Sequence, residues 1–434
     1  MTLRIRCALA AVSLFVAAPA LAALSPPEQV MVRTVDAEQA RTTAMLQRWV
    51  DQNSGTMNRA GVEAVRRMVE PEFQQLGFKT EWIDMRAAGR AGHLVAHHVG
   101  SRSGKRLLLI AHLDTVFEPD SPFQRWVANG NQARGPGAGD DKGGIAVIVA
   151  ALRAMQSAGT LKQANITVFM TGDEEDAGNP LSISRRDLIA EGRQADAALD
   201  FEDLAEENGL DMGSTARRSA GSWTLTVTGR SAHSAGVGAN NEGAIYELAR
   251  IIDQFRRELP EDKLTYNVGL VGGGQTAQLD QGRIRLEATG KTNIIAATAV
   301  ARGDLRAISQ DQIDRTRAKM RAIVAQPLAG THAEISFDED SYPPMPPTGG
   351  NRALLTRLNG VNRDMGLPEM GELDPAKRGA GDISFVAADV DGLVGLGPAS
   401  GGAHTANETV DIPSIFKQAK RAAILMSRLA RERR

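Results

Sequence analysis

The sequence has 434 residues, of which 42% are apolar and 24% charged. This composition is typical of a globular chain long enough for two or three domains. The formal net charge is only −2, so nothing indicates a polyanionic partner, and we expect no nucleic-acid binding. The single cysteine, Cys7, lies close to the N-terminus.

The first 22 residues are typical of a secretory signal peptide. Two arginines lie within the first seven residues, a small and apolar stretch covers residues 8–21, and Ala20-Leu21-Ala22 resembles a cleavage site. This stretch is shorter than the ~20 apolar residues of a membrane span, which makes an N-terminal anchor the less favoured alternative. We therefore expect a periplasmic or secreted protein, with no membrane attachment and no cysteine after cleavage.

Helices and strands alternate in the first half of the chain. Helical spacing covers residues 26–76, with a loop at 53–55, and returns at 145–156. Apolar runs predict strands over 79–85, 93–99, 107–112, 165–170 and 195–201. This alternation indicates an α/β fold with a mostly parallel sheet covered by helices on both faces. Functional residues then belong at the carboxyl ends of the strands.

The pattern changes near Ser219. The next elements are predicted in the order strand, helix, strand, strand, helix, strand, over residues 222–228, 241–259, 265–271, 297–306, 310–324 and 332–337. This order matches a ferredoxin-like module. A turn-rich segment beginning at Tyr342 marks the return to the α/β pattern, which ends in an amphipathic helix from Ser414. We therefore expect a catalytic domain in two parts, 23–218 and 342–434, with an inserted domain at 219–341.

The first chemically informative stretch joins a strand to a glycine-rich turn. His112 follows the apolar run LLLIA, and Asp114 points to the same side of an extended chain, where it could orient a metal-bound imidazole. The turn GPGAGDDKGG then carries Asp140 and Asp141 to the start of a helix. The alternatives are a strand-end histidine without metal and a simple N-cap carboxylate.

Further acids and one more histidine follow later strands or glycines. Glu174 and Glu175 follow ITVFM, Glu202 follows AALDF, and His404 lies in SGGAHTANET. Without cysteine, zinc ligands must come from His, Asp and Glu, and in a pair of glutamates one can ligate metal while the other takes a proton from water. A solvated acidic turn is the alternative for the pair, and Asp200 and Asp203 compete with Glu202.

Together these motifs resemble a known family. HLDTV, GPGAGDDKGG, TGDEE, LDFE and GGAHTANE are similar to the signature blocks of the aminoacylase, succinyl-diaminopimelate desuccinylase and glutamate carboxypeptidase family of co-catalytic zinc hydrolases. The resemblance covers nearly the whole chain after residue 22. GPG-DDKGG and residues 292–295 (TNII) are most similar to the secreted glutamate carboxypeptidase branch. The resemblance implies a di-zinc exopeptidase-like domain with an inserted lid domain, through which two chains form a homodimer.

The resemblance also implies roles for the metal-site residues. Asp140 would bridge two zinc ions, one also bound by His112 and Glu202 and the other by Glu175 and His404. Glu174 would be the general base, and the peptide bond that follows Asp140 would be cis. Cobalt or manganese could substitute for zinc in such a site.

The inserted domain would supply further site residues. His233, in the block SAHSAG, would reach the active site of the partner subunit and help polarise the substrate carbonyl. Asn293 and Arg306 match positions that help to hold the substrate carboxylate. The alternatives are an ordinary loop asparagine and an exposed strand arginine.

Two features leave questions open. The frame Ala-Asp-x-x-Leu-x-Phe-Glu favours Glu202 as the third carboxylate ligand, although Asp200 remains an alternative. After Glu175 the chain reads DAGNPLS where the family often has a short Gly-Ser turn, so its substrate preference can differ. We expect an exported carboxypeptidase that releases C-terminal glutamate or a similar residue from peptides or folate-like N-acyl substrates. An aminoacylase or dipeptidase, or a catalytically inactive binding protein on the same scaffold, are the alternatives.

Overall fold

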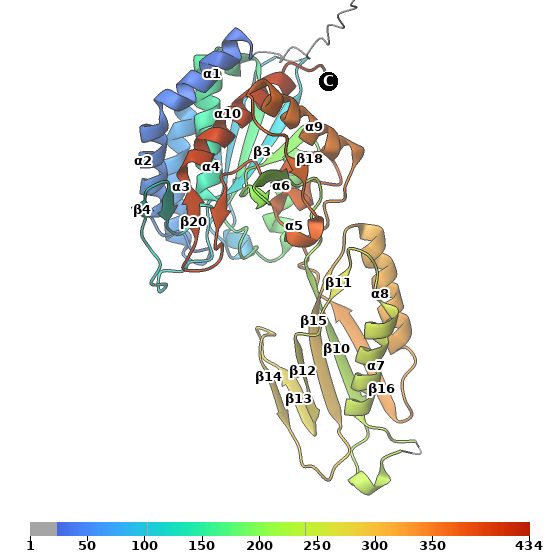
Figure 1. Cartoon of the computed structure of the whole chain (residues 1–434). Coiled ribbons are helices and arrows are strands. Elements are labelled where there is room, and N and C mark those ends of the chain that lie inside the picture. The colour runs from blue at the N-terminus through green and yellow to red at the C-terminus, as the bar shows by residue number, and fades with distance from the viewer. Residues whose placement is uncertain (1–23, 102, 239) are drawn as a thin grey trace, which may run out of the picture.

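The computed structural model describes residues 24–101, 103–238 and 240–434, and the predicted signal peptide lies outside them. The chain forms two units (Figure 1). The larger unit contains both the N-terminal and the C-terminal segments, and the second unit, residues 221–337, extends away from it. In the part of the chain described, no helix is both long and apolar enough to cross a membrane.

A six-stranded sheet forms the centre of the larger unit, in the order β1-β2-β6-β3-β7-β18. The strands are β1 (Lys79–Asp84), β2 (Gly92–His98), β3 (Arg106–His112), β6 (Asn165–Thr171), β7 (Ala197–Asp200) and β18 (Gly392–Val394). The four strands from β6 to β18 are parallel, whereas β1 and β2 pair antiparallel at the edge. The predicted α/β class is confirmed. The edge differs because a short turn joins β1 to β2, and parallel neighbours would require a longer crossover.

Helices cover both faces of this sheet. They are α1 (Pro26–Ala37), α2 (Gln39–Val50), α3 (Arg59–Gln75), α4 (Lys142–Ser157), α5 (Leu181–Ser184), α6 (Arg186–Gly192), α9 (Gly349–Asp364) and α10 (Ile412–Leu429). Leu107 and Leu109 of β3 face the core that includes α1–α4, α9 and α10, whereas Leu108 and Ile110 face α6 and the short helix η5 (Asp382–Phe385). Burial on both faces explains why β3 reads as a continuous apolar run.

The glycines of the turn GPGAGDDKGG allow α4 to start against β7. A Cβ on Gly144 would lie 2.1 Å from both Asp141 Oδ1 and the carbonyl oxygen of Phe201. Only glycine fits such a close approach, so the sequence brings the two aspartates directly beside the end of β7. The rest of α4 is buried on nearly all sides, as expected for a helix that is apolar all round.

Two small sheets lie at the edges of the larger unit. One contains β4 (Val127–Asn129), β5 (Gln132–Arg134), β19 (Ser400–Gly401) and β20 (Thr409–Asp411). The other contains β8 (Ala205–Glu207), β9 (Leu210–Gly213) and β17 (Gly371–Glu372). Through β19 and β20, the first sheet holds the segment 402–408 next to the turn that carries Asp140.

The second unit contains a sheet in the order β11-β15-β10-β16, with β12 also paired to β15. Its elements are β10 (Gly221–Gly229), α7 (Ala244–Glu258), β11 (Thr265–Tyr266), β12 (Leu270–Gly274), β15 (Thr298–Arg306), α8 (Gln310–Val324) and β16 (Thr331–Phe337). The helices pack on one face around Trp223 and Phe255. The strand predicted over 265–271 is divided into β11 and β12.

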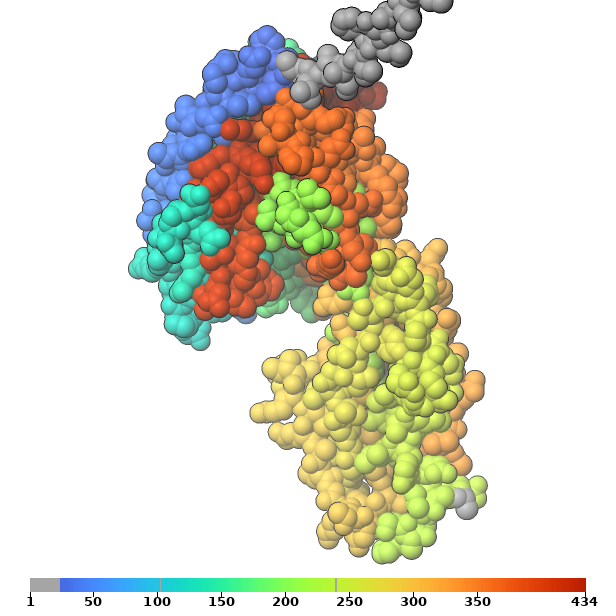
Figure 2. Space-filling view, in the orientation of Figure 1, coloured from blue at the N-terminus to red at the C-terminus, as the bar shows by residue number. Residues whose placement is uncertain are grey.

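A hairpin that the sequence did not predict lies between β12 and β15. It contains β13 (Thr276–Leu279) and β14 (Leu286–Thr289), which turn around Asp280. Strands of four residues are too short for a reliable alternation pattern, which explains the omission. The hairpin projects beside a hollow between the two units (Figures 1 and 2).

Two linkers join the units and run antiparallel to each other. Arg217 exchanges two backbone hydrogen bonds of 2.9 Å with Met345, and Ala220 exchanges two with Tyr342. β10 starts at this junction and runs away from it for nine residues, or about 30 Å at ~3.3 Å per residue. Residues directly after Gly229 therefore lie at the far end of the second unit.

Candidate metal centre

The predicted ligands converge at the carboxyl ends of the central strands. His112 is the last residue of β3, and Glu175 lies in the loop that follows β6. Asp140 lies two residues before the start of α4, and His404 comes from the segment between β19 and β20. Ligand atoms of His112, Asp140 and Glu175 lie within 4.8 Å of one another, which is close enough for a metal ion to bind all three.

Asp140 lies between the two histidines. Its Oδ1 is 2.9 Å from His112 Nε2, and its Oδ2 is 3.3 Å from His404 Nε2. His404 Nε2 is also 3.1 Å from Glu175 Oε2. Each carboxylate oxygen of Asp140 therefore faces a different imidazole, which is the arrangement required of a carboxylate that bridges two metal ions.

Asp114 links His112 to the loop of the glutamate pair. Its Oδ1 lies 3.4 Å from His112 Nδ1, on the side of the ring opposite Asp140. The same carboxylate accepts hydrogen bonds from the backbone N–H groups of Glu174 (3.1 Å) and Glu175 (3.2 Å), and from the Thr56 hydroxyl (2.6 Å). Such a carboxylate fixes the ring orientation of a histidine whose other nitrogen binds metal.

The carboxylates around both histidines favour imidazolium in the metal-free protein. Burial opposes a charge on His112, but hydrogen bonds to Asp114 and Asp140 outweigh it and raise the pKa of His112 well above its usual range. Hydrogen bonds to Asp140 and Glu175 raise the pKa of His404 to about 11. The same two histidines outweigh burial at Asp140 and lower its pKa.

The pKa of Glu174 is shifted in the opposite direction to that of Asp140. Burial raises the pKa of its carboxyl well above the usual range, and the neighbouring Glu202 carboxylate raises it further, although His112 partly opposes the shift. A carboxyl whose pKa is raised towards the working pH can both accept and return a proton. Glu174 is therefore a candidate for proton transfer.

The three candidates for the last carboxylate ligand have different surroundings. A Glu202 oxygen accepts a hydrogen bond of 2.6 Å from Arg217, and Glu202 is not among the three clustered ligands. Asp200 is buried, has one oxygen without a hydrogen-bond partner, and has a pKa raised to about 8, first by burial and then by Glu202. Asp203 is occupied by Arg378 and by the Ser400 hydroxyl.

Asp141 does not cap α4 with its side chain. It occupies the N-cap position, but its carboxylate accepts a hydrogen bond of 3.3 Å from the backbone N–H of His112. The Asp140–Asp141 peptide bond is cis, as the family resemblance implied. The simple capping interpretation is therefore wrong for Asp141.

The sequence-based interpretation missed two residues next to the centre. The Glu408 carboxylate accepts hydrogen bonds from the backbone N–H groups of Gly139 (3.1 Å) and Asp140 (3.3 Å), and burial raises its pKa to about 7. Glu408 lies four residues after His404 in the block GGAHTANE, and this proximity could have marked it as a site residue. The second missed residue is Arg217, the buried ion-pair partner of Glu202, and no sequence motif indicated it.

His233, Asn293 and Arg306 were expected to contact the substrate from the second unit. They do not all lie together in one chain. His233 and Asn293 lie together beyond the far end of β10, where the Asn293 carbonyl accepts a hydrogen bond from Ser234. Arg306 ends β15 at the linker side, next to Thr265 of β11. Asn293 precedes the nine-residue strand β15 and Arg306 ends it, so the two residues lie towards opposite ends of a strand about 30 Å long.

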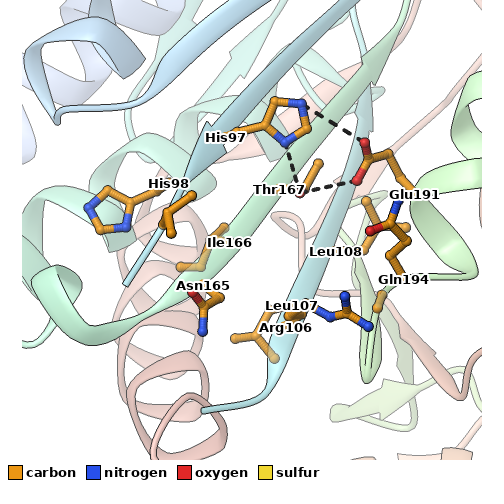
Figure 3. A pocket seen from close by; sticks show the side chains of 12 residues that line it. His97, His98, Arg106, Leu107, Leu108, Asn165, Ile166, Thr167, Glu191 and Gln194 are labelled. Carbon is orange, nitrogen blue, oxygen red and sulfur yellow. Dashed lines mark hydrogen bonds and ion pairs between the residues drawn. The ribbon is translucent and has the colours of Figure 1, made fainter. Parts of the chain in front are cut away.

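A separate pocket of about 310 Å³ lies at the other end of the central strands, beside the amino ends of β3 and β6 (Figure 3). His97 Nδ1 and Thr167 Oγ1 are 3.2 Å apart, and the Thr167 hydroxyl also donates to Glu191 (Figure 3). The adjacent His98 points to the other face of β2, as alternation along a strand requires. Because this pocket offers only His97 and Glu191 as close ligands, it does not resemble the candidate metal centre.

The donor set fits a pair of metal ions. Imidazole nitrogens and carboxylate oxygens are the ligands that zinc accepts when no thiolate is present. The carboxylates that meet here outnumber the cations in contact with them: Asp140, Asp141, Glu174, Glu175, Asp200 and Glu202 against His112, His404 and Arg217. Metal ions bound here would compensate the excess buried negative charge.

A mixed sheet covered by helices, with histidines and paired carboxylates at its strand ends, is the arrangement expected of a metal-dependent hydrolase. Comparison with known proteins gives the family. The family described as "Peptidase family M20/M25/M40" matches residues 108–428, so the chain belongs to this family of metal-dependent peptidases and amidohydrolases. The family expected from the sequence motifs is confirmed.

Two relatives illustrate the similarity. The chain is 30% identical over 322 residues to carboxypeptidase G2 of Pseudomonas sp. (strain RS-16), covering 71% of this chain and 70% of that protein. It is 24% identical to succinyl-diaminopimelate desuccinylase of Azoarcus sp. (strain BH72), covering 80% of this chain and 88% of the relative.

Solved structures share the fold across both units. A Staphylococcus aureus tripeptidase has a TM-score of 0.72 at 19% identity, covering 91% of this chain and 99% of the other. A dinuclear metal-binding M20 peptidase of Bacillus subtilis has a TM-score of 0.63 at 14% identity, with the same coverage. These structures confirm the fold, and the family match with the similarity to carboxypeptidase G2 makes the protein an enzyme of the peptidase and amidohydrolase type.

Proposed function

We propose that the chain is an exported di-zinc carboxypeptidase that releases C-terminal glutamate, or a similar amino acid, from peptides or folate-like N-acyl substrates. The observation that carries the metal assignment is the position of Asp140, whose two oxygens face His112 and His404. Similarity to carboxypeptidase G2 supports the substrate class. The predicted signal peptide supports export.

The contacts around Asp140 support four of the proposed ligands, and the family resemblance supplies the fifth, Glu202. Asp140 would be shared by two metal ions, one of them also held by His112 and Glu202 and the other by Glu175 and His404. Asp114 orients His112 through Nδ1. Two zinc ions bound here would polarise the amide carbonyl and lower the pKa of a water molecule.

Glu174 performs the proton transfers of the proposed reaction. Its buried carboxylate takes a proton from the attacking water, which adds to the amide carbonyl carbon. The carbon–nitrogen bond then breaks, and Glu174 returns the proton to the leaving amine. The raised pKa of Glu174 suits both steps, because the group can bind the proton and release it again.

We propose that a second copy of the chain completes the site. His233 and Asn293 lie at the far end of the second unit, whereas Arg306 lies near the linkers. Contacts from all three to one substrate therefore require His233 and Asn293 from the partner and Arg306 from the same chain. An apolar groove near His233 supports the dimer, because the side chains of Val237, Ile245 and Tyr246 that line it are exposed.

This assignment retains the domain division expected from the sequence. Residues 23–218 and 342–434 form the catalytic domain, and residues 219–341 form the lid and dimerisation domain. The antiparallel linkers at the two boundaries support it, because the chain leaves and returns at one place.

Hydrolysis of a substrate panel tests the function. A folate-type glutamate conjugate, N-acyl amino acids and dipeptides are incubated with the purified mature protein, with and without chelator. We expect fastest hydrolysis of the glutamate conjugate, loss of activity with chelator and recovery with zinc. Preference for N-acyl amino acids or dipeptides would instead identify an aminoacylase or a dipeptidase.

The variant Glu174→Gln tests the mechanism. Because glutamine preserves the shape but accepts no proton, the variant should retain two zinc ions and lose turnover. Full activity would exclude Glu174 as the base. Fewer than two metal ions in the unmodified protein, together with no hydrolysis of any substrate, would favour an inactive binding protein.

A further inference from the structure

Each linker between the two units places one side chain on the metal centre. Arg217, on the outgoing linker, contacts Glu202, and Tyr342, on the returning linker, contacts Glu174. The linkers are themselves joined by backbone hydrogen bonds. The junction between the units is thus in direct contact with both sides of the site.

Tyr342 contacts the backbone of the loop that carries the glutamate pair. Its hydroxyl donates a hydrogen bond of 2.8 Å to the carbonyl oxygen of Glu174 and accepts one of 3.1 Å from Arg185 Nη2. Its ring packs edge-on against Phe385, with centroids 4.8 Å apart. Its backbone N–H donates to the carbonyl of Ala220 at 2.9 Å.

Arg185 fixes the residue before Glu174. This fully buried arginine pairs with Asp173 at 2.6 Å and with Asp382 at 2.8 Å, and it also donates to the Asp173 carbonyl at 3.0 Å. Asp382 in turn accepts from the hydroxyl of Thr171, the last residue of β6. A buried network with this many satisfied partners makes the loop rigid.

We propose that Tyr342 is a positioning residue that ties the loop of Glu174 to the returning linker. Its hydrogen bond fixes the peptide plane between Glu174 and Glu175, and therefore the direction in which both side chains leave the backbone. The orientation of the second unit and the position of the base are coupled through this contact. The inference rests on the proposed role of Glu174 as general base.

The rate should be sensitive to this contact. Displacement of a catalytic group by about 1 Å can cost on the order of a hundredfold in rate. Loss of the hydrogen bond from Tyr342 to the Glu174 carbonyl oxygen would allow the Glu174 carboxylate to move by part of this distance. Substrate binding should change little, because the Tyr342 hydroxyl contacts only the backbone of the loop, at the carbonyl oxygen of Glu174.

The variant Tyr342→Phe removes the hydroxyl and keeps the ring against Phe385. We expect kcat on the fastest substrate of the panel to fall about tenfold, the factor that corresponds to one hydrogen bond. The KM, the zinc content and the melting temperature should stay close to those of the unmodified protein. Tyr266→Phe, a half-buried tyrosine in the second unit, is the matched control and should leave kcat unchanged.

A double-mutant cycle with Glu174→Asp distinguishes positioning of the base from a general structural role. If Tyr342 acts through Glu174, its effect on kcat should largely disappear in the Glu174→Asp background, because the shorter carboxylate is already misplaced. An unchanged kcat in Tyr342→Phe, or the same tenfold loss in both backgrounds, would overturn the inference. Full activity of Glu174→Asp and Glu174→Gln would instead reject the proposed function.

Discussion

The Arg217 guanidinium lies 2.6 Å from a carboxylate oxygen of Glu202 and 3.7 Å from Asp200. Arg217 is nearly inaccessible to solvent, and it also donates to the carbonyl groups of Gly379 and Ala380. A single buried cation thus faces two acidic side chains in the metal-free protein, and it is closer to Glu202. Metal bound at Glu202 would take over part of this compensation.

Arg217→Met should therefore destabilise the metal-free protein more than the zinc-loaded protein. Without the guanidinium, Glu202 is left buried and unpaired, which costs roughly 3–5 kcal/mol. Denaturant unfolding with and without zinc measures the difference. Arg218→Met, at the neighbouring and more exposed arginine, is the control. Equal losses in both states would indicate that Glu202 does not bind metal.

The number of bound metal ions distinguishes Glu202 from Asp200 as the third carboxylate ligand. Glu202→Gln should reduce bound zinc from two ions per chain to one, because an amide is a much weaker ligand than a carboxylate. Asp200→Asn should keep both ions. Elemental analysis of the purified variants measures this, and the reverse pattern would identify Asp200 as the ligand.

Metal binding near pH 7 should release protons. The pKa of His404 is raised to about 11 and that of His112 lies well above its usual 6.5, so both imidazoles carry a proton in the metal-free protein that a metal ion must displace. Calorimetric titration in buffers of different ionisation enthalpy counts the protons, and His404→Asn should release about one fewer. Unchanged release in this variant would contradict the assignment.

The same shift predicts how the stability of the metal-free protein depends on pH. Because the folded pKa of His404 is raised, its stabilising contribution is complete below about 6.5 and is lost as the pH rises through about 11. Thermal unfolding of metal-free protein across this range, compared with His404→Asn, measures the effect. The side chain is 58% exposed, so solvent screening keeps the contribution small.

Subunit complementation tests the shared site. We expect His233→Ala and Glu174→Gln to be nearly inactive separately. A mixed dimer contains one intact site, with Glu174 from one chain and His233 from the other. Random reassociation of equal amounts should restore about one quarter of the unmodified activity, since half of the dimers are mixed and each has one working site. No recovery after confirmed exchange would show that His233 does not act across the dimer.

Local sequence patterns were sufficient for most of the central sheet and for the metal-site candidates. The apolar run ending in His112 favoured a buried strand, and GPGAGDDKGG combined the glycines of a close helix start with two acids. The hairpin at 276–289 was missed because its strands are short, and the antiparallel edge because pairing direction depends on connections rather than on strand composition. Glu408 carried a weak signal beside His404, whereas Arg217 and Tyr342 carried none.

The sequence by itself determined the chemistry available to this protein: two histidines and a set of acids at strand ends and glycine turns, in the order of a zinc hydrolase family. Only the tertiary structure decided how these groups face one another. Asp140 meets His404 across more than 260 residues of chain, and Tyr342 meets Glu174 across 168. Such contacts depend on how separate elements pack, and the periodicity of one segment contains no information about the side chains that another segment places against it.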